Sequence, residues 1–192
     1  MARPRTFEPE IALEAAMTSF WKHGFSETSY DDLVTDTGVS RKSLYSVFGD
    51  KESLFIAALA HYAKIQIPQM YGPLLQEDVT VEDIYGMFMS LREMFLQTPD
   101  LKGCMLTNLA GDQAIHNPAI KKVYDDHGDK VISLFTDALI RAGVDEEKAK
   151  ELGIYYRGVT LALQLMVHAK TEFEVMDRFM NTSLNELRAL MK

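Results

Sequence analysis

The chain has 192 residues, 47% of them hydrophobic, with 6 Pro, 11 Gly, one Cys and a formal net charge of -8. This composition suits one domain or two small ones, and it excludes long disordered tracts and a disulfide framework. No apolar run reaches the roughly 18 residues of a membrane span, and the first residues lack a signal-peptide core, so with the lone cysteine we expect a cytoplasmic protein without a membrane partner. The negative charge argues against non-specific polyanion binding by the whole protein.

The N-terminal part carries much less of this charge, with seven basic and nine acidic side chains in residues 1–64. Residues 1–7 are predicted to form an arm in which Arg3 and Arg5 could reach a minor groove or phosphates. A solvated terminus explains them equally well. A helix is predicted from Pro9 to Gly24, and Trp21 and Phe25 are expected to close a three-helix core.

Residues 28–53 predict two short helices around a tight turn and the start of a third. Ser29 and Asp32 fit a capping box, and Gly38 suits the left-handed end of the first helix. Ser40 is placed to cap the second helix, whose apolar face includes Leu44. Gly49 ends that helix and Asp50 caps the next. This is a helix-turn-helix pattern with one buried face and one face of hydrogen-bond donors.

The donor face supplies the candidates for DNA contact. Lys42 and Ser43 are predicted to contact base edges, with Arg41 and Ser46 as helpers. Thr28 and Ser29, at a helix N-terminus, could serve phosphates, and Ser40 lies at the next helix start. The same arrangement also occurs as plain scaffold in helical proteins that never touch DNA.

The rest of the chain predicts helices only, so the fold class is all-α. A helix from Asp50 is expected to reach Gln66 or beyond, until Pro68, Gly72 and Pro73 break or kink it. The further expected helices are Asp83–Gln97, Leu101–Ile115, Ala119–Ala142, one that Asp145 caps, and Phe173–Met191.

The last two long helices predict self-association. The helix after Asp145 is apolar nearly all round from Ile154 to Val167, and the final helix has a strong apolar stripe. We expect a homodimer in which these helices pack on their symmetry mates. A purely intramolecular core is the alternative.

Methionine and polar side chains on these helices predict a small-molecule site, because methionine adapts to varied ligands and buried polar groups orient them. Ordinary core packing is the alternative for each residue singly. The candidates are Met87, Phe88, Leu91, Arg92, Phe95, Met105, Asn108, Arg157, Gln164 and His168.

One part of the sequence resembles a known family. The residues that carry the resemblance are Phe20, Gly24-Phe25, Thr28-Ser29, Gly38-Val39-Ser40, Leu44-Tyr45, Phe48 and Lys51-Glu52-Ser53-Leu54-Phe55. They are similar to the N-terminal domain of tetracycline-repressor-like (TetR) transcriptional regulators over residues 8–60. The chain departs from the family at residues 33–37, a difference that concerns packing more than contacts.

The resemblance implies a sequence-specific, dimeric repressor that a small-molecule effector releases from operator DNA. It places Tyr45 and Lys51 at positions that usually hold phosphates. It also implies three parts: an arm and helix-turn-helix domain in 1–50, a connecting helix in 51–66, and an effector-binding and dimerisation domain in 67–192. A helical module that binds a ligand or partner without reading DNA is the alternative.

Cys104 is a further candidate, as a sensor of oxidants or electrophiles. A helix N-terminus and the nearby Lys102 would both favour its thiolate. Residues 103–106 also resemble a Gly-Cys-Leu/Met-Leu stretch of a TetR subgroup in which some members sense such compounds at this cysteine. A buried, inert thiol is the alternative.

Enzymatic and metal-binding motifs are not found in the sequence. It contains no HExxH, Cys/His metal spacing, GxSxG, P-loop or GxGxxG. We therefore predict no catalytic residues, no metal and no cofactor.

Overall fold

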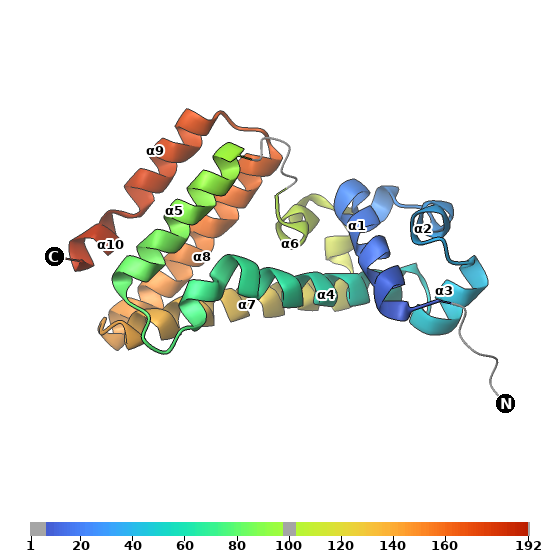
Figure 1. Cartoon of the computed structure of the whole chain (residues 1–192), viewed down its shortest axis with the longest axis horizontal. Helices are drawn as coiled ribbons and strands as arrows, with labels where there is room; N and C mark the ends of the chain where they lie inside the picture. Colours follow the sequence, from blue (N-terminus) through green and yellow to red (C-terminus); the bar gives the residue numbers. More distant parts are fainter. Residues whose placement is uncertain (1–6, 98–102, 192) are drawn as a thin grey trace.

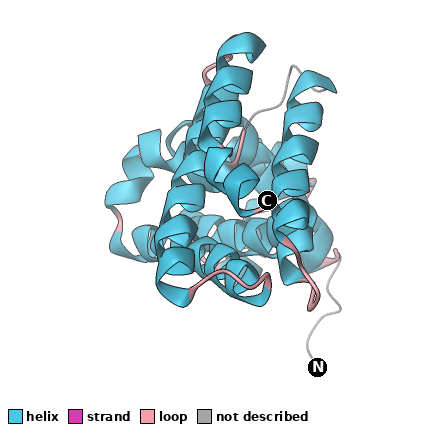
Figure 2. Cartoon of the chain, turned by 90° about the vertical axis from the view of Figure 1, so that its left-hand side faces the viewer, coloured by secondary structure: helices cyan, strands magenta, loops and turns pink. Residues whose placement is uncertain are grey.

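The computed structural model describes residues 7–97 and 103–191, and every regular element within them is a helix (Figure 2). The expected all-α class is confirmed. The α-helices are α1 (Pro9–Glu27), α2 (Tyr30–Thr37), α3 (Arg41–Phe48), α4 (Lys51–Tyr71), α5 (Val81–Gln97), α6 (Met105–Asn108), α7 (Pro118–Arg141), α8 (Glu146–His168), α9 (Phe173–Ser183) and α10 (Asn185–Leu190). Three short 3-10 turns are η1 (Gly72–Leu75), η2 (Leu109–Gly111) and η3 (Gln113–His116).

The helices form a head and a body (Figure 1). The head consists of α1, α2, α3 and the start of α4, at one end of the molecule. Helix α4 runs from the head into the body and packs on α7. In the body, α8 packs on α7 and α9, while α6 lies between α1 and α8. The arm at residues 1–6, with Arg3 and Arg5, lies outside the described residues.

The helix ends of the head follow the predicted caps. Ser29 and Asp32 form a reciprocal capping box, and Ser40 and Asp50 accept hydrogen bonds from the first turns of α3 and α4. Gly38 ends α2 with a φ of 64°, a left-handed conformation that costs glycine little. These local signals therefore set the turn between α2 and α3.

Helix α4 continues through the exposed Pro68 to Tyr71, whose side chain is buried in the body, and so ends at Gly72 within the predicted range. Two other predicted helices differ from the structure. The helix expected over 101–115 is split into the short α6 and the turns η2 and η3. The final helix breaks at Leu184, which redirects the chain so that Leu184 and Leu187 both stay buried.

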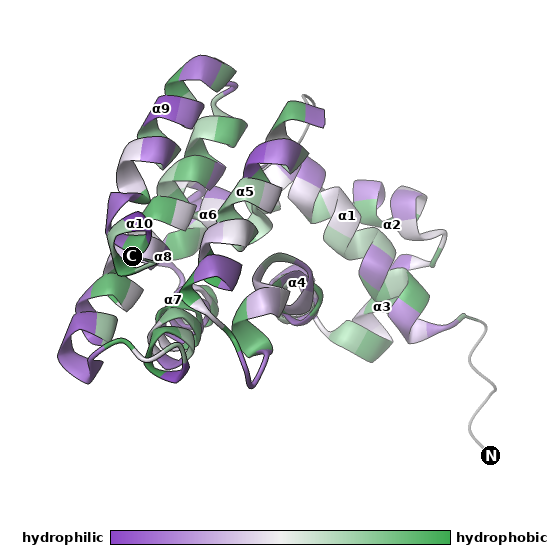
Figure 3. Cartoon of the chain, turned by 60° about the vertical axis from the view of Figure 1, so that its left-hand side comes forward, coloured by the Kyte–Doolittle hydropathy of each residue, from purple (hydrophilic) through white to green (hydrophobic). Residues whose placement is uncertain are grey.

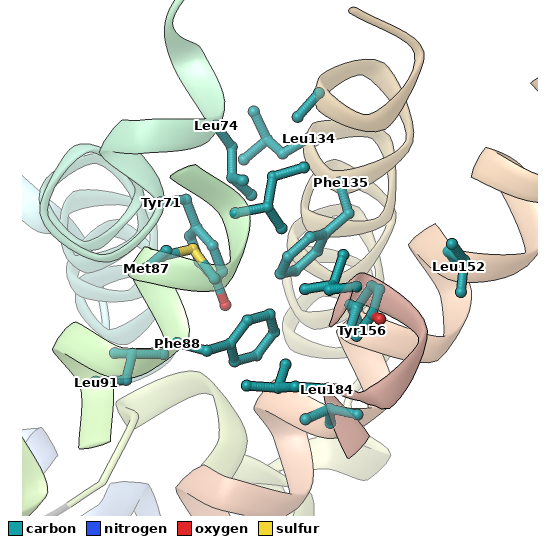
Figure 4. Packing of buried hydrophobic residues seen from close by; sticks show 14 of the residues in the cluster. Tyr71, Leu74, Met87, Phe88, Leu91, Leu134, Phe135, Leu152, Tyr156 and Leu184 are labelled. Carbon is teal, nitrogen blue, oxygen red and sulfur yellow. The ribbon is translucent and has the colours of Figure 1, made fainter. Parts of the chain in front are cut away.

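Two clusters of buried hydrophobic residues hold the molecule together. The body cluster joins the end of α4 and α5 to α7–α10, with Tyr71, Phe88, Phe135 and Tyr156 packed at its centre (Figure 4). The head cluster joins α1–α4 to residues 104–120, including Leu106. Packing thus assigns the segment around α6 to the head, although it follows α5 in the chain.

None of the helices in the described ranges combines the length and apolar character that crossing a bilayer requires.

Candidate DNA-binding face and cavities

Helix α3 presents a polar face to solvent because its apolar residues anchor it in the head. Leu44 is fully buried, and Val39 is buried in the turn before the helix. Arg41, Lys42, Tyr45 and Ser46 are exposed. We call the outward side chains of Arg41, Lys42, Ser43, Tyr45 and Ser46 the recognition face.

The start of this face is pre-ordered by two serines. The hydroxyls of Ser40 and Ser43 lie 2.9 Å apart, and the Ser40 hydroxyl also accepts the N–H of Ser43 at 3.3 Å. Lys42 and Ser46 make no side-chain hydrogen bond or ion pair with the described part of the chain. Their donors are therefore available to a base edge or a phosphate.

Tyr30, which the sequence analysis did not single out, fixes the angle between α2 and α3. Its ring stacks on Tyr45 with centroids 4.5 Å apart, and the Arg41 guanidinium lies 4.8 Å from its centroid. Its hydroxyl donates to the carbonyl of Gly49 at 3.2 Å. Burial raises the pKa of Tyr30 to about 12, so the hydroxyl stays a donor at neutral pH.

Three predicted phosphate contacts are differently placed. Thr28 is buried, and its hydroxyl donates to the carbonyl of Gly24 at 2.6 Å, so the side chain does not face solvent. The Ser29 hydroxyl is exposed but donates to Asp32 at 2.6 Å. Lys51 lies over the Phe25 ring at 4.3 Å, and partial burial lowers its pKa.

The head is tied to the segment around α6 by Asp112. Its carboxylate accepts the N–H groups of Phe25 and Ser26, at 2.8 and 3.3 Å, and the Ser26 hydroxyl at 2.7 Å. Gly24 kinks α1 at this point with a φ of 80°, and a Cβ there would lie 2.9 Å from the Asp112 carboxylate. Only glycine therefore allows this close approach.

A cavity of about 280 Å³, the junction cavity, opens beside this contact. Its walls include Lys22 and His23 of the head and Met105, Asn108 and His168 from the other side. Met105, Asn108 and His168 are among the ligand-binding residues predicted from the sequence.

A second cavity, of about 220 Å³, lies between the head cluster and the body cluster, and we call it the seam cavity. Its walls come from five parts of the chain, namely α1, α4, α5, α8 and the residues just before α6. They consist of Trp21, Tyr62, Gln66, Gln69, Met70, Leu91, Met94, Gly103, Cys104 and Gln164.

The structure thus divides the predicted ligand residues among several environments. Leu91 and Gln164 line the seam cavity. Met87 and Phe88 are packed inside the body cluster (Figure 4), and Arg92 forms an ion pair with Asp177 of α9. Arg157 lies beside Gly128 of α7, and the side chain of Phe95 lies outside the described residues.

Cys104 lies on the wall of the seam cavity and is 2% exposed. Its thiol accepts a hydrogen bond from the Gln66 amide at 3.7 Å. Helix α6, which follows it, has only 4 residues, so the helix dipole that was expected to favour a thiolate is small. Lys102 lies outside the described residues.

The head geometry and the helical body together define a class, the helix-turn-helix transcriptional regulators. Within the described residues, no group of three or more metal-ligating side chains is found that could hold an ion.

Comparison with known proteins defines the family. Residues 12–58 match the model of the bacterial regulatory proteins of the TetR family, and residues 80–157 match that of the C-terminal domain of LmrA/YxaF-like transcriptional regulators. The chain therefore has a TetR family N-terminal domain and a TetR-like C-terminal domain.

Individual relatives agree with this assignment. The transcriptional repressor ComR of Escherichia coli is 35% identical over 107 residues, which are 55% of this chain and 51% of ComR. The regulator YezE of Bacillus subtilis is 26% identical over 74% of this chain and 73% of its own length. This chain therefore spans about half of ComR.

A solved structure extends the likeness to the whole fold. The TetR family regulator CifR, as a cysteine mutant complexed with a 26-bp operator duplex, matches 98% of this chain and 99% of its own. The TM-score is 0.78 at 23% sequence identity.

Proposed function

We propose that this protein is a homodimeric transcriptional repressor that binds operator DNA through α3 and is released by a small molecule. The recognition face carries the proposal, because Lys42 and Ser46 are exposed without a side-chain partner in the described part of the chain, and Ser40 orders Ser43 beside them. That CifR was solved on operator DNA supports the same role for this chain.

The outer faces of α8 and α9 support the dimer. Along α8, Ile154 and Leu165 are exposed at 63% and 43%, with Gly158 and Leu161 between them at helical spacing. Val175 on α9 is exposed at 49%. Figure 3 shows hydrophobic residues interspersed with hydrophilic ones on these helices. An apolar stripe of this kind favours a four-helix interface between two copies, which would present two heads to two half-sites.

Effector release requires that the small molecule bind more tightly to the conformation that fits DNA poorly. Of the two cavities described above, the seam cavity is the better candidate for the effector site, because it lies between the head cluster and the body cluster. A ligand that changes the distance between these two clusters would move α3 relative to the two-fold axis of the dimer.

The test is an anisotropy titration against DNA from upstream of the protein's own gene, with a scrambled duplex as control. Lys42→Ala is expected to weaken specific binding by about 1–3 kcal/mol. Lys130→Ala, which removes an exposed lysine of the body, serves as the matched control and is expected to have no effect. Unchanged binding by Lys42→Ala would refute the recognition face.

A second candidate switch is modification of Cys104, favoured by its place on the seam cavity wall. Because the thiol is buried, a reagent must enter that cavity to reach it. If Cys104→Ser still releases DNA on treatment with an electrophile, the thiol is not the switch.

A further inference from the structure

The described residues that line the seam cavity carry no charge. Among its described wall residues there is no Lys, Arg, His, Asp or Glu, and most are apolar or aromatic. An unpaired ion would lose its hydration there without gaining a counter-ion, which is strongly unfavourable. The cavity therefore selects for neutral molecules.

Two residues of this cavity's wall each carry a buried polar atom that has no partner in the described part of the chain. Gln66 is 6% exposed, and its amide nitrogen donates to the sulfur atoms of Met70 and Cys104, at 3.3 and 3.7 Å. With the amide in this orientation, Gln66 Oε1 has no donor in the described part of the chain. The indole Nε1 of Trp21 is buried without an acceptor. Orphaned buried groups are rare and indicate a missing partner.

We propose that the seam cavity binds a small, neutral, largely apolar molecule whose hydroxyl or primary amide group donates to Gln66 Oε1 and accepts from Trp21 Nε1. The inference rests on the proposed function, in which a small-molecule effector releases the DNA, and it names the chemical class of that effector. A group that both donates and accepts satisfies both orphaned atoms at once.

Trp21 makes the head part of this site. It lies on α1, and its ring also contacts Tyr62 of α4, with centroids 5.3 Å apart. A ligand in the cavity therefore touches the head, the connecting helix and the body together. Occupancy changes the contact between the two clusters directly, without a relay through other residues.

Trp21 is also the only tryptophan of the chain, and it lines the junction cavity as well as the seam cavity. Its fluorescence therefore reports on ligands in either cavity, and variants of Gln66, which lines only the seam cavity of the two, assign the signal. The full-length protein is titrated with four probes of similar size: benzyl alcohol, toluene, benzoate and benzylammonium. Benzyl alcohol should give a saturable change in fluorescence and bind about tenfold more tightly than toluene, because only the alcohol pairs with the orphaned atoms. The two ions should bind at least about 100-fold more weakly than the alcohol.

Substitution of Gln66 tests the polar contact. In Gln66→Leu, the preference for benzyl alcohol over toluene should disappear, while toluene still binds. Gln66→Met, which keeps an unbranched side chain of similar length, should give the same result if packing is not responsible. Gln76→Leu makes the same chemical change at an exposed position outside the cavity and should behave as the parent chain.

Three results would overturn the inference: no saturable signal with benzyl alcohol, equal affinity for the ions, or an alcohol preference that survives in both Gln66 variants. The titration contains no DNA, so its outcome is separate from that of the operator assay. Specific DNA binding without probe binding would refute the ligand class alone. Probe binding without DNA binding would refute the proposed function and leave the cavity assignment standing.

Discussion

At the scale of single residues, His127 of α7 is a buried titratable group remote from the recognition face. It is 7% exposed, and its Nδ1 has no partner in the described part of the chain. Burial, followed by the positive charge of Arg157, lowers its pKa to about 4. The folded protein therefore holds this imidazole neutral.

This predicts a loss of stability in mild acid. Between about pH 6.5 and pH 4 the unfolded chain binds a proton at this histidine and the folded chain does not, so stability falls with falling pH, by up to about 3 kcal/mol. Urea unfolding at a series of pH values across this range measures the free energy of unfolding. His127→Gln should show a shallower pH dependence than the parent chain, and identical slopes would contradict the prediction.

Residues that act locally were predictable from the sequence, and those that act across the fold were not. The capping roles of Ser29, Ser40 and Asp50 depend on neighbours within three positions, so spacing alone revealed them. Trp21 and Gln66 meet Leu91 at a cavity only after tertiary packing. The one available signal was Gln66 itself, a polar residue in the apolar stripe of a long helix.

At the scale of elements, Asp112 connects the head to the segment around α6. Burial by itself would raise the pKa of this carboxyl, but hydrogen bonds from Ala114, Ser26 and Phe25 outweigh it and hold the pKa below its usual value. The stability that it contributes is present above the unfolded pKa of about 4 and is lost as pH falls through the lower folded value.

Removal of this carboxylate should loosen the junction. Asp112→Ala is expected to lower the free energy of unfolding at pH 7 by about 1–3 kcal/mol, because it leaves several donors at a partly buried site unpaired. Asp125→Ala removes an exposed carboxylate paired only with Lys121 and should cost less than about 1 kcal/mol. Equal losses in the two variants would show that Asp112 is an ordinary surface residue.

Elements with strong periodicity were predicted well, and those shaped by distant contacts were not. Helix α7 has a clear stripe and a cap, and it formed close to its predicted bounds, while α8 begins after its predicted cap, Asp145. The region 104–116 folds instead as short turns, because its apolar residues pack against the head cluster from several directions. Periodicity in one helix does not contain that information.

At the scale of the whole molecule, the exposed stripe on α8 predicts the assembly. Leu165→Glu is expected to turn a dimer into a monomer, since it places a charge in an apolar interface. Sedimentation velocity measures the change. Leu75→Glu alters a residue of η1 with 49% exposure, away from this face, and should remain dimeric. A dimeric Leu165→Glu protein would place the interface elsewhere.

Packing rather than chain order decides which residues belong to the head and which to the body. Leu106 and Ile120 complete the hydrophobic cluster of the head although they lie far from it in sequence. A chain shortened after Gln66 would leave that cluster open to water. In hydrogen exchange, we therefore expect the amides of α6 to become unprotected together with those of α1, as one cooperative unit distinct from α8 and from the part of α7 that lies in the body cluster.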